Sequence, residues 1–239
     1  MRKTLKILLV ILIAISLIAG GLAIWQRKNI ESILIGLRED STQIDKRRND
    51  NQTNLVDDMN TYLDSPLRDM TQDEKEKLEA GETTASEIYQ KMFEEKIEEV
   101  KENKPQEQTG KKPEEEKASY TQKESKDEIV SRYMVDLYKL QNEFNSRAES
   151  TIKEGGWYYE KRKTRQHDPV ARAETITHYT PIVRGIEKEC DTKFEGVVKS
   201  LEGELIAAGY DTAVINTIRN TYANEKRLKL SYYANKYLK

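Results

Sequence analysis

The feature that most constrains this chain is one uncharged run in an otherwise very polar sequence. Residues 7–25 are mostly aliphatic and carry no charge, which is long enough for a helix to cross about 30 Å of hydrocarbon. Arg2, Lys3 and Lys6 precede the run, and Trp25 stands at its end, where interfacial aromatic residues are common. The run predicts a transmembrane signal anchor over residues 1–28, with the N-terminus cytoplasmic and the C-terminal domain extracytoplasmic in a single-pass cell-membrane protein.

A cleaved signal peptide is the alternative to an anchor. Ala19 and Gly21 are small residues at the spacing of a cleavage site. The apolar run nevertheless continues past them to Trp25, and Cys190, the single cysteine, is far too distant to mark a lipoprotein. These observations favour an uncleaved anchor.

Composition favours helices for the rest of the chain. Charged residues make up 34% of the sequence, while there are only 11 glycines and 5 prolines among 239 residues. Forty Lys and Arg nearly balance forty-two Asp and Glu, for a formal net charge of -2. We therefore expect an all-α protein with charged amphipathic helices and no nucleic-acid partner.

Two segments follow the anchor. Residues 29–65 carry an apolar stripe that thins along the chain, so we predict a juxtamembrane helix or stalk that ends at Ser65-Pro66. Residues 66–103 contain two capping boxes, Thr71 with Glu74 and Thr84 with Glu87. They predict a short helix followed by an amphipathic acidic helix, whose glutamate row we interpret as a solvated face.

The remaining chain divides at a charged, proline-containing stretch. Apart from two prolines, residues 104–119 have no apolar side chain larger than alanine, and residues 104–120 are predicted to form a flexible charged linker. Residues 121–239 carry the most continuous apolar stripes, which predict an antiparallel helical bundle of three or more helices. We expect the segment from about Asp127 to Lys239 to fold alone. The expected core includes Leu137, Phe144, Ile186, Val197, Leu201 and Ile218.

Glycines and prolines set the expected boundaries within this bundle. Gly155-Gly156 is predicted to stop its first helix. Asp168 is expected to cap the next helix with Pro169 at its first position, and Pro181 to kink that helix or start another. The short link 209–211 then requires the last two helices to run antiparallel.

No catalytic or cofactor motif is present in the sequence. His167 and His178 lack the short spacing that places two metal ligands on one helix face. Cys190 occupies a stripe position that suits a packed thiol better than a nucleophile. There is no nucleotide-binding loop or hydrolase motif, so we expect no enzyme, no cofactor and no metal site.

The stretch after Gly156 is the most suggestive surface. As an expected loop, it places three aromatic residues among four basic ones: Trp157, Tyr158, Tyr159, Lys161, Arg162, Lys163 and Arg165. This combination suits contact with a protein partner, a glycan or an anionic polymer. The structural alternative is that the aromatic rings cover the end of the bundle while the basic groups stay solvated.

These features favour a noncatalytic, membrane-anchored interaction or scaffold protein of the cell envelope. Its helices are expected to contact protein partners or further copies of the chain. The alternative is a binding module for an anionic cell-wall polymer or glycan, acting through residues 157–165.

Overall fold

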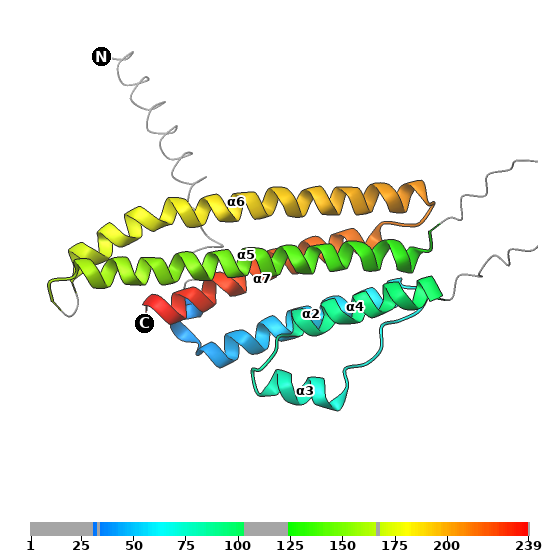
Figure 1. Cartoon of the computed structure of the whole chain (residues 1–239), viewed down its shortest axis with the longest axis horizontal. Coiled ribbons are helices and arrows are strands. Elements are labelled where there is room, and N and C mark those ends of the chain that lie inside the picture. Colours follow the sequence, from blue (N-terminus) through cyan, green and yellow to red (C-terminus); the bar gives the residue numbers. More distant parts are fainter. Residues whose placement is uncertain (1–30, 33, 103–123, 166–167, 239) are drawn as a thin grey trace, which may run out of the picture. The chain divides into compact units, whose positions relative to one another are not determined.

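The computed structural model describes residues 31–32, 34–102, 124–165 and 168–238. All regular elements in these ranges are helices, which confirms the all-α prediction (Figure 1). They are α2 (Ser41–Tyr62), α3 (Gln72–Glu79), α4 (Ala85–Glu102), α5 (Lys126–Arg162), α6 (Pro169–Ala207) and α7 (Ala213–Leu238).

Two predicted segments lie outside the described residues. They are the membrane anchor, residues 1–28, and the linker, residues 104–120. Among the residues that are described, none of the helices combines the length and apolar character needed to cross a bilayer.

The chain forms two compact units whose boundaries fall inside α2 and α7. The first unit comprises Met1–Leu55 and Asn216–Lys239, and the second comprises Val56–Ile215. Segment boundaries drawn from composition therefore differ from the units defined by packing.

Polar contacts join α2 to α7 in the first unit. The guanidinium of Arg48 lies 2.8 Å from Glu225, and both side chains are largely buried. Asn51 Nδ2 donates a hydrogen bond to the carbonyl of Thr221 (3.2 Å). Nearer the chain ends, Asn235 Nδ2 donates to the carbonyls of Gly36 (2.9 Å) and Glu39 (2.6 Å). The end of α7 is thereby fixed to the chain just before α2.

In the second unit, α5 is the central helix. Both α4 and α6 pack along it, and each runs antiparallel to it (Figure 1). Against α4, the fully buried Phe93 ring lies 6.1 Å from the ring of Tyr138. On the α6 side, Val198 and Leu201 are fully buried. Helix α4, which precedes the linker in sequence, is thus part of the same core as α5. The folding of the segment from about Asp127 to Lys239 alone stays a prediction.

Local hydrogen bonds set the helix ends, several of them as the sequence predicts. Thr71 and Glu74 form a complete capping box at the start of α3. Thr84 and Glu87 bond reciprocally before α4, with distances of 2.9 and 3.3 Å. Asp168 caps α6 through the N–H groups of Val170 and Ala171, with proline following. These predictions are confirmed.

The expected stop at Gly155-Gly156 is wrong, because α5 continues through both glycines to Arg162. Neither glycine has the positive φ of a helix-ending residue, which Gly81 and Gly209 do have. Gly155 is buried against α6, where an added Cβ would lie 3.5 Å from the Tyr179 ring. Packing of this kind outweighs the roughly 1 kcal/mol that a helical glycine costs relative to alanine.

Two details of α6 also differ from expectation. The helix passes through Pro181 without a break, so the expected alternative that a new helix begins there is wrong, and a kink at Pro181 stays a prediction. Val198 is buried instead of Val197, while Ile186 is only half-buried. The inner face of this stretch consists of Phe194, Val198, Leu201 and Leu205, because contact with α5 selects the phase of the stripe.

Candidate interaction surface

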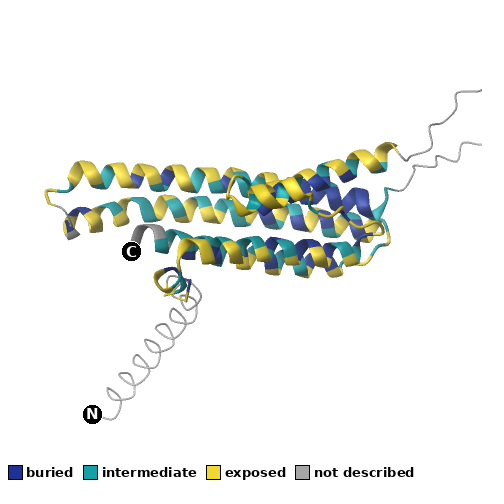
Figure 2. Ribbon diagram, turned by 90° about the horizontal axis from the view of Figure 1, so that it is seen from below, coloured by how far each residue is buried: buried dark blue, intermediate teal, exposed yellow. Residues whose placement is uncertain are grey.

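The α5–α6 hairpin has two unlike halves. We call residues 146–162 and 169–190 the distal half, and residues 126–145 and 191–207 the proximal half. Figure 2 shows α5 largely buried in its first turns and mostly exposed or intermediate toward its end. Among the described side chains of the distal half, the buried residues are Thr151, Gly155 and Ala171, which are all small. The distal half thus has no large apolar core of its own.

Aromatic stacking and ion pairs hold the distal half together instead. The ring of Tyr158 stacks on His178 with centroids 5.1 Å apart and planes 2° from parallel. Tyr179 meets both rings edge-on. The guanidinium of Arg162 lies 4.2 Å from the Tyr158 centroid and 3.2 Å from Glu174. His178 is accordingly a stacking residue between the two helices.

A row of ion pairs continues along the seam between α5 and α6. Arg147 lies 2.8 Å from Glu189, and Lys193 lies 3.0 Å from the same carboxylate. Hydrogen bonds from Arg147, and then from Lys193, lower the pKa of Glu189 to about 2. Further along, Glu204 accepts from both Arg132 and Tyr133 at 2.6 Å. This row ties the two helices together at their solvent-facing edge.

A shallow groove of about 540 Å³ lies on the same seam. Its lining residues are Tyr133, Asp136, Lys139, Leu140, Glu143, Lys193, Gly196, Val197 and Ser200. Glu143 and Lys193 pair with each other across it at 3.3 Å, and Lys139 lies 3.8 Å from Glu94 of α4. Because these charges already have partners within the fold, the groove is better explained as a feature of helix packing than as a ligand site.

The predicted aromatic and basic site is helical, which corrects the expected loop. Trp157, Tyr158, Tyr159, Lys161 and Arg162 form the last turns of α5, Lys163 is its C-cap, and Arg165 follows. The physical cause is the one that carries α5 through Gly155 and Gly156. Contact with α6 extends α5 past residue 156, so the residues that follow are helical.

The structure separates these residues into two groups. Tyr158 and Arg162 belong to the stack described above, the Tyr159 hydroxyl accepts the N–H of Asp168 (3.3 Å), and Lys163 pairs with Glu160 (2.6 Å). By contrast, Trp157 is 71% exposed, and Lys161 and Arg165 are exposed. Neither of these two basic side chains forms an ion pair with a residue that the structure describes. Part of the predicted set is therefore structural and part is available for binding.

Lys153 is a surface residue that the sequence reasoning missed. It is exposed and stands four positions before Trp157, just as Lys161 stands four positions after it. Residues four apart lie on the same face of a helix. We call Lys153, Trp157 and Lys161 the Trp157 face. The spacing was present in the sequence, but an expected helix end at Gly155-Gly156 concealed it.

The exposed apolar residues of α6 do not enlarge this face into one patch. Val170 is 64% exposed, Ile176 is 51% exposed and Ile182 is 43% exposed. They follow one another at intervals of six residues, which places them on three different sides of a helix. Trp157 is therefore the principal apolar contact residue of the distal half.

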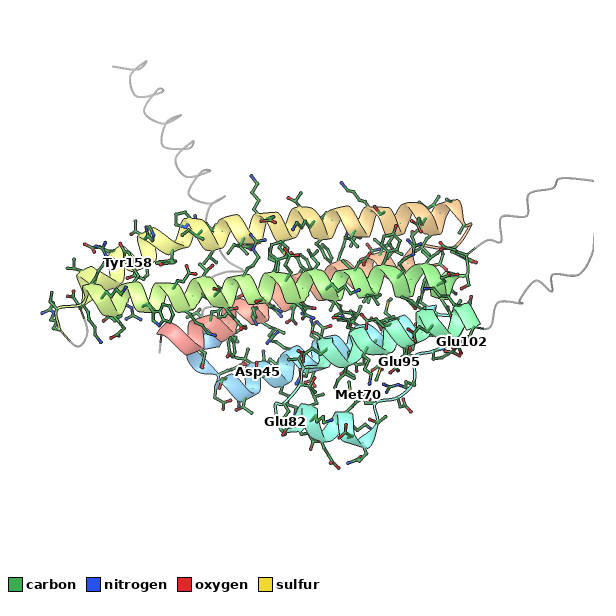
Figure 3. All side chains as sticks on the ribbon, viewed as in Figure 1. Asp45, Met70, Glu82, Glu95, Glu102 and Tyr158 are labelled. Carbon is green, nitrogen blue, oxygen red and sulfur yellow. The ribbon has the colours of Figure 1, made fainter. Side chains whose placement is uncertain are left out.

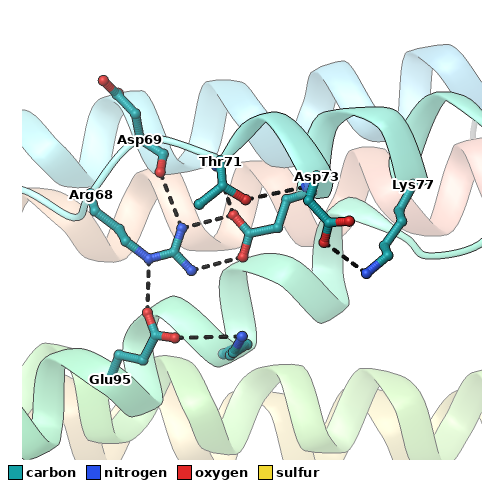
Figure 4. A network of polar contacts seen from close by, with 8 residues as sticks. Arg68, Asp69, Thr71, Asp73, Lys77 and Glu95 are labelled. Carbon is teal, nitrogen blue, oxygen red and sulfur yellow. Dashed lines mark hydrogen bonds and ion pairs between the residues drawn. The ribbon is translucent and has the colours of Figure 1, made fainter.

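The acidic row of α4 is also divided by the structure. Arg68 binds Glu95 (2.8 Å) and makes two 2.7 Å hydrogen bonds to Glu74, as Figure 4 shows for part of this network. Glu99 lies 3.4 Å from the buried Lys96. Glu98 and Glu102 are exposed and pair with no described residue. The row is thus partly neutralised within the fold, and these two carboxylates remain available.

The residues considered for metal binding have structural positions. Asp168 caps α6, and hydrogen bonds from the backbone N–H groups of Thr164 and Ala171 lower its pKa to about 2. His178 is stacked, His167 lies outside the described residues, and Cys190 is a half-buried thiol without a disulfide. Within the described ranges, no three His, Cys, Asp or Glu side chains come together as metal ligands.

Together these observations define a helical-bundle protein with an exposed tryptophan and lysine face on a long hairpin. Comparison with family models, with curated proteins and with solved structures finds no match to the chain. Its function is therefore argued from its sequence and its surface.

Proposed function

We propose that this protein is a noncatalytic, membrane-anchored interaction or scaffold protein of the cell envelope. The apolar run over residues 7–25 supports the anchor, and the basic cluster before it supports an extracytoplasmic helical domain. The single observation that supports a binding role is the 71% exposure of Trp157 within a regular helix.

Exposure of this tryptophan is informative because of its size and its setting. Tryptophan is among the residues most enriched in the energetic centres of protein interfaces. The neighbouring rings of Tyr158 and Tyr179 contact each other within the hairpin, whereas the Trp157 ring stays exposed to solvent. Lysines on both sides of it would add charge recognition to an apolar contact.

Site-specific photo-crosslinking in cells tests the binding role. A photoreactive amino acid in place of Trp157 is expected to capture discrete protein adducts, whether of a partner or of a second copy. The control is the same substitution at Ile206, which is 62% exposed on α6 but lies outside the distal half. Equal adducts from both positions, or none from residue 157, would contradict a specific surface there.

Binding of an anionic wall polymer is the second candidate. Lys161 and Arg165 favour it, because both are exposed and follow Trp157 within eight residues of the chain. Tyr158 and Tyr159 argue against a broad aromatic platform, since both are engaged within the hairpin. Recovery of wall material alone in the crosslinking experiment would favour this candidate over a protein partner.

Anchoring and sidedness are tested separately. The full-length chain is expected to stay in membranes through alkaline carbonate washing with its N-terminus intact. Protease added outside wall-stripped cells should digest the chain after residue 28. A mature N-terminus near Leu22 would show cleavage instead of anchoring, and digestion only after lysis would reverse the topology.

A further inference from the structure

The two compact units of the chain differ in charge. The first unit contains 15 Lys and Arg against 6 Asp and Glu, a formal charge of +9. The second contains 25 Lys and Arg against 36 Asp and Glu, a formal charge of -11. The basic unit is also the one that includes the predicted membrane anchor. Basic groups near a membrane are attracted to anionic lipid headgroups, so this unit is the one suited to a membrane surface.

The end of α7 supplies much of the positive charge of the first unit. Residues 226–239 contain five Lys or Arg, three Tyr and no Asp or Glu. Glu225, which comes just before them, is largely buried and pairs with Arg48 at 2.8 Å. Its carboxylate is therefore neutralised within the fold. A basic and tyrosine-rich stretch of this kind is typical of segments at a membrane interface.

Lysines and tyrosine rings lie against each other on this stretch. The Nζ atom of Lys229 is 5.6 Å from the ring centroid of Tyr232 and 5.4 Å from that of Tyr233. One turn earlier, the Nζ atom of Lys226 is 5.7 Å from the ring centroid of Tyr222. All five side chains are half-buried. Lysine stems and tyrosine rings combine an apolar body with a polar tip, which suits the boundary between hydrocarbon and water.

The fold of the first unit brings this stretch to the chain that follows the anchor. Asn235 Nδ2 donates to the carbonyls of Gly36 (2.9 Å) and Glu39 (2.6 Å). Figure 3 shows the last turns of α7 beside the start of α2, where Asp45 is labelled. The eight residues from Lys28 to Gly36 span about 12 Å as a helix and at most about 29 Å when extended. The end of α7 is thus held within a short distance of the proposed membrane surface.

We propose that residues 226–238 of α7 form a second membrane contact, which binds anionic phospholipid headgroups. The contact rests on the proposed membrane anchor, because the anchor holds the first unit at the bilayer. Each basic group close to an anionic membrane strengthens binding by a factor of about five. The contact would restrict rotation of the first unit about the anchor, and a fixed orientation suits a scaffold protein.

Acidic residues on the neighbouring chain do not cancel this charge. Three of them precede α2, namely Glu31, Glu39 and Asp40. Glu39 pairs with Arg47 at 2.8 Å, and Asp40 accepts the backbone N–H of Gln43 at 2.8 Å. The five basic residues of the α7 stretch therefore remain in excess at this end of the unit.

Hydrogen exchange of the full-length chain in lipid nanodiscs tests the contact. One set of discs contains phosphatidylcholine alone, and the other contains an equal mixture of phosphatidylcholine and anionic phosphatidylglycerol. Backbone amides of residues 226–238 are expected to exchange about fivefold more slowly in the anionic discs, and high salt should remove the difference. Residues 191–207 of α6, in the acidic unit, are the internal control and should exchange equally in both discs.

Two matched variants test whether the lysines are responsible. Lys226→Gln with Lys229→Gln should remove most of the slowing in anionic discs. Lys188→Gln with Lys199→Gln loses the same charge at exposed positions of α6 and should behave as wild type. Circular dichroism melting checks that each variant stays folded, and the wild-type comparison does not depend on either variant.

Equal exchange of residues 226–238 in the two kinds of disc would overturn the lipid contact. Slowing that persists in full after loss of Lys226 and Lys229 would do the same. Equal slowing in phosphatidylcholine discs on addition of soluble polyphosphate would assign the stretch to a soluble or wall-bound anion instead. Failure of the proposed anchor has a different signature, because the chain would then not stay in either kind of disc, and the membrane contact would fall with it.

Discussion

The proximal and distal halves of the α5–α6 hairpin are built from the same two helices by different means. In the proximal half, apolar residues such as Val130 and Leu201 are fully buried, and α4 adds Phe93. In the distal half, small residues line the interface and stacked rings with ion pairs replace a large apolar core. The difference shows how one hairpin combines an apolar base with an arm that is joined by ring stacking and ion pairs and that exposes Trp157.

The energetic consequence is an uneven distribution of stability. Burial of large apolar side chains provides most of the driving force for folding. Exposed ion pairs such as Arg162 with Glu174 contribute about 0 to 1 kcal/mol each. We therefore expect substitutions of similar size to have unequal effects in the two halves. One comparison addresses both halves, and three others each test a single half.

The largest effect is expected for Phe93→Ala in full-length protein. Phe93 has no exposed surface, and truncation of a buried phenylalanine typically costs about 3 to 5 kcal/mol. Trp157→Ala removes a larger ring from the distal half, yet its effect should stay within about 0.5 kcal/mol, because that ring is already solvated. Denaturant unfolding followed by circular dichroism measures both. Equal losses would contradict the division into halves.

Leu201→Ala should follow, with a loss of about 2 to 5 kcal/mol, because Leu201 is fully buried between α6 and α5. Ile206→Ala on the same helix is the control, since Ile206 is mostly exposed. A clear drop in melting temperature for Leu201→Ala alone would confirm the phase of the buried stripe. The opposite order would require α6 to be rotated.

A smaller effect of opposite sign is expected in the distal half. Gly155→Ala and Gly156→Ala should each stabilise the protein by about 0.5 to 1 kcal/mol, because alanine restricts the unfolded chain and favours a helix. At position 155 the added Cβ would make an ordinary contact with Tyr179 at 3.5 Å, and at position 156 it would meet nothing within 4 Å. Destabilisation by both variants would show that the helix does end there.

The smallest effect is expected for the pH dependence of stability that the Glu189 ion pairs provide between α5 and α6. The pKa of Glu189 is lowered to about 2 by Arg147 and Lys193, whereas an unfolded glutamate titrates near roughly 4.3. The pair therefore contributes stability above the unfolded pKa and loses it as pH falls toward 2. The melting temperature of Glu189→Gln should lie slightly below that of wild type at pH 7, and this gap should close by about pH 2. A gap that widens in acid would show that Glu189 is not held as an ion pair.

The helix class and several helix ends were predictable because their causes are local. A capping box needs only Thr71 and Glu74, and an N-cap needs only Asp168 and the residues that follow. Periodicity likewise indicated Leu201 and Phe144 as core residues, and both are buried. The membrane anchor and the envelope location stay predictions, since residues 1–28 lie outside the described ranges.

The residues of the candidate site were predictable, but their helical conformation and the exposure of each side chain were not. Composition singled out residues 157–165, yet it could not show that Tyr158 stacks on His178 or that Trp157 faces outward. Which ring is exposed depends on the rotation of α5 against α6, and that rotation depends on contacts far along the chain. Lys153 shares a helix face with Trp157 because α5 runs through the two glycines, and the sequence did not predict that continuation.

By itself the sequence determined an all-helical chain, its capped helix starts and an apolar run suited to a membrane, because these follow from hydrogen bonds and side-chain periodicity within a few residues. Only the tertiary structure decided that α4 packs on α5 across the predicted linker, and that Val198 is buried in place of Val197. Burial is shared between helices that are distant in sequence. No single segment contains the information that selects its partner or its buried face.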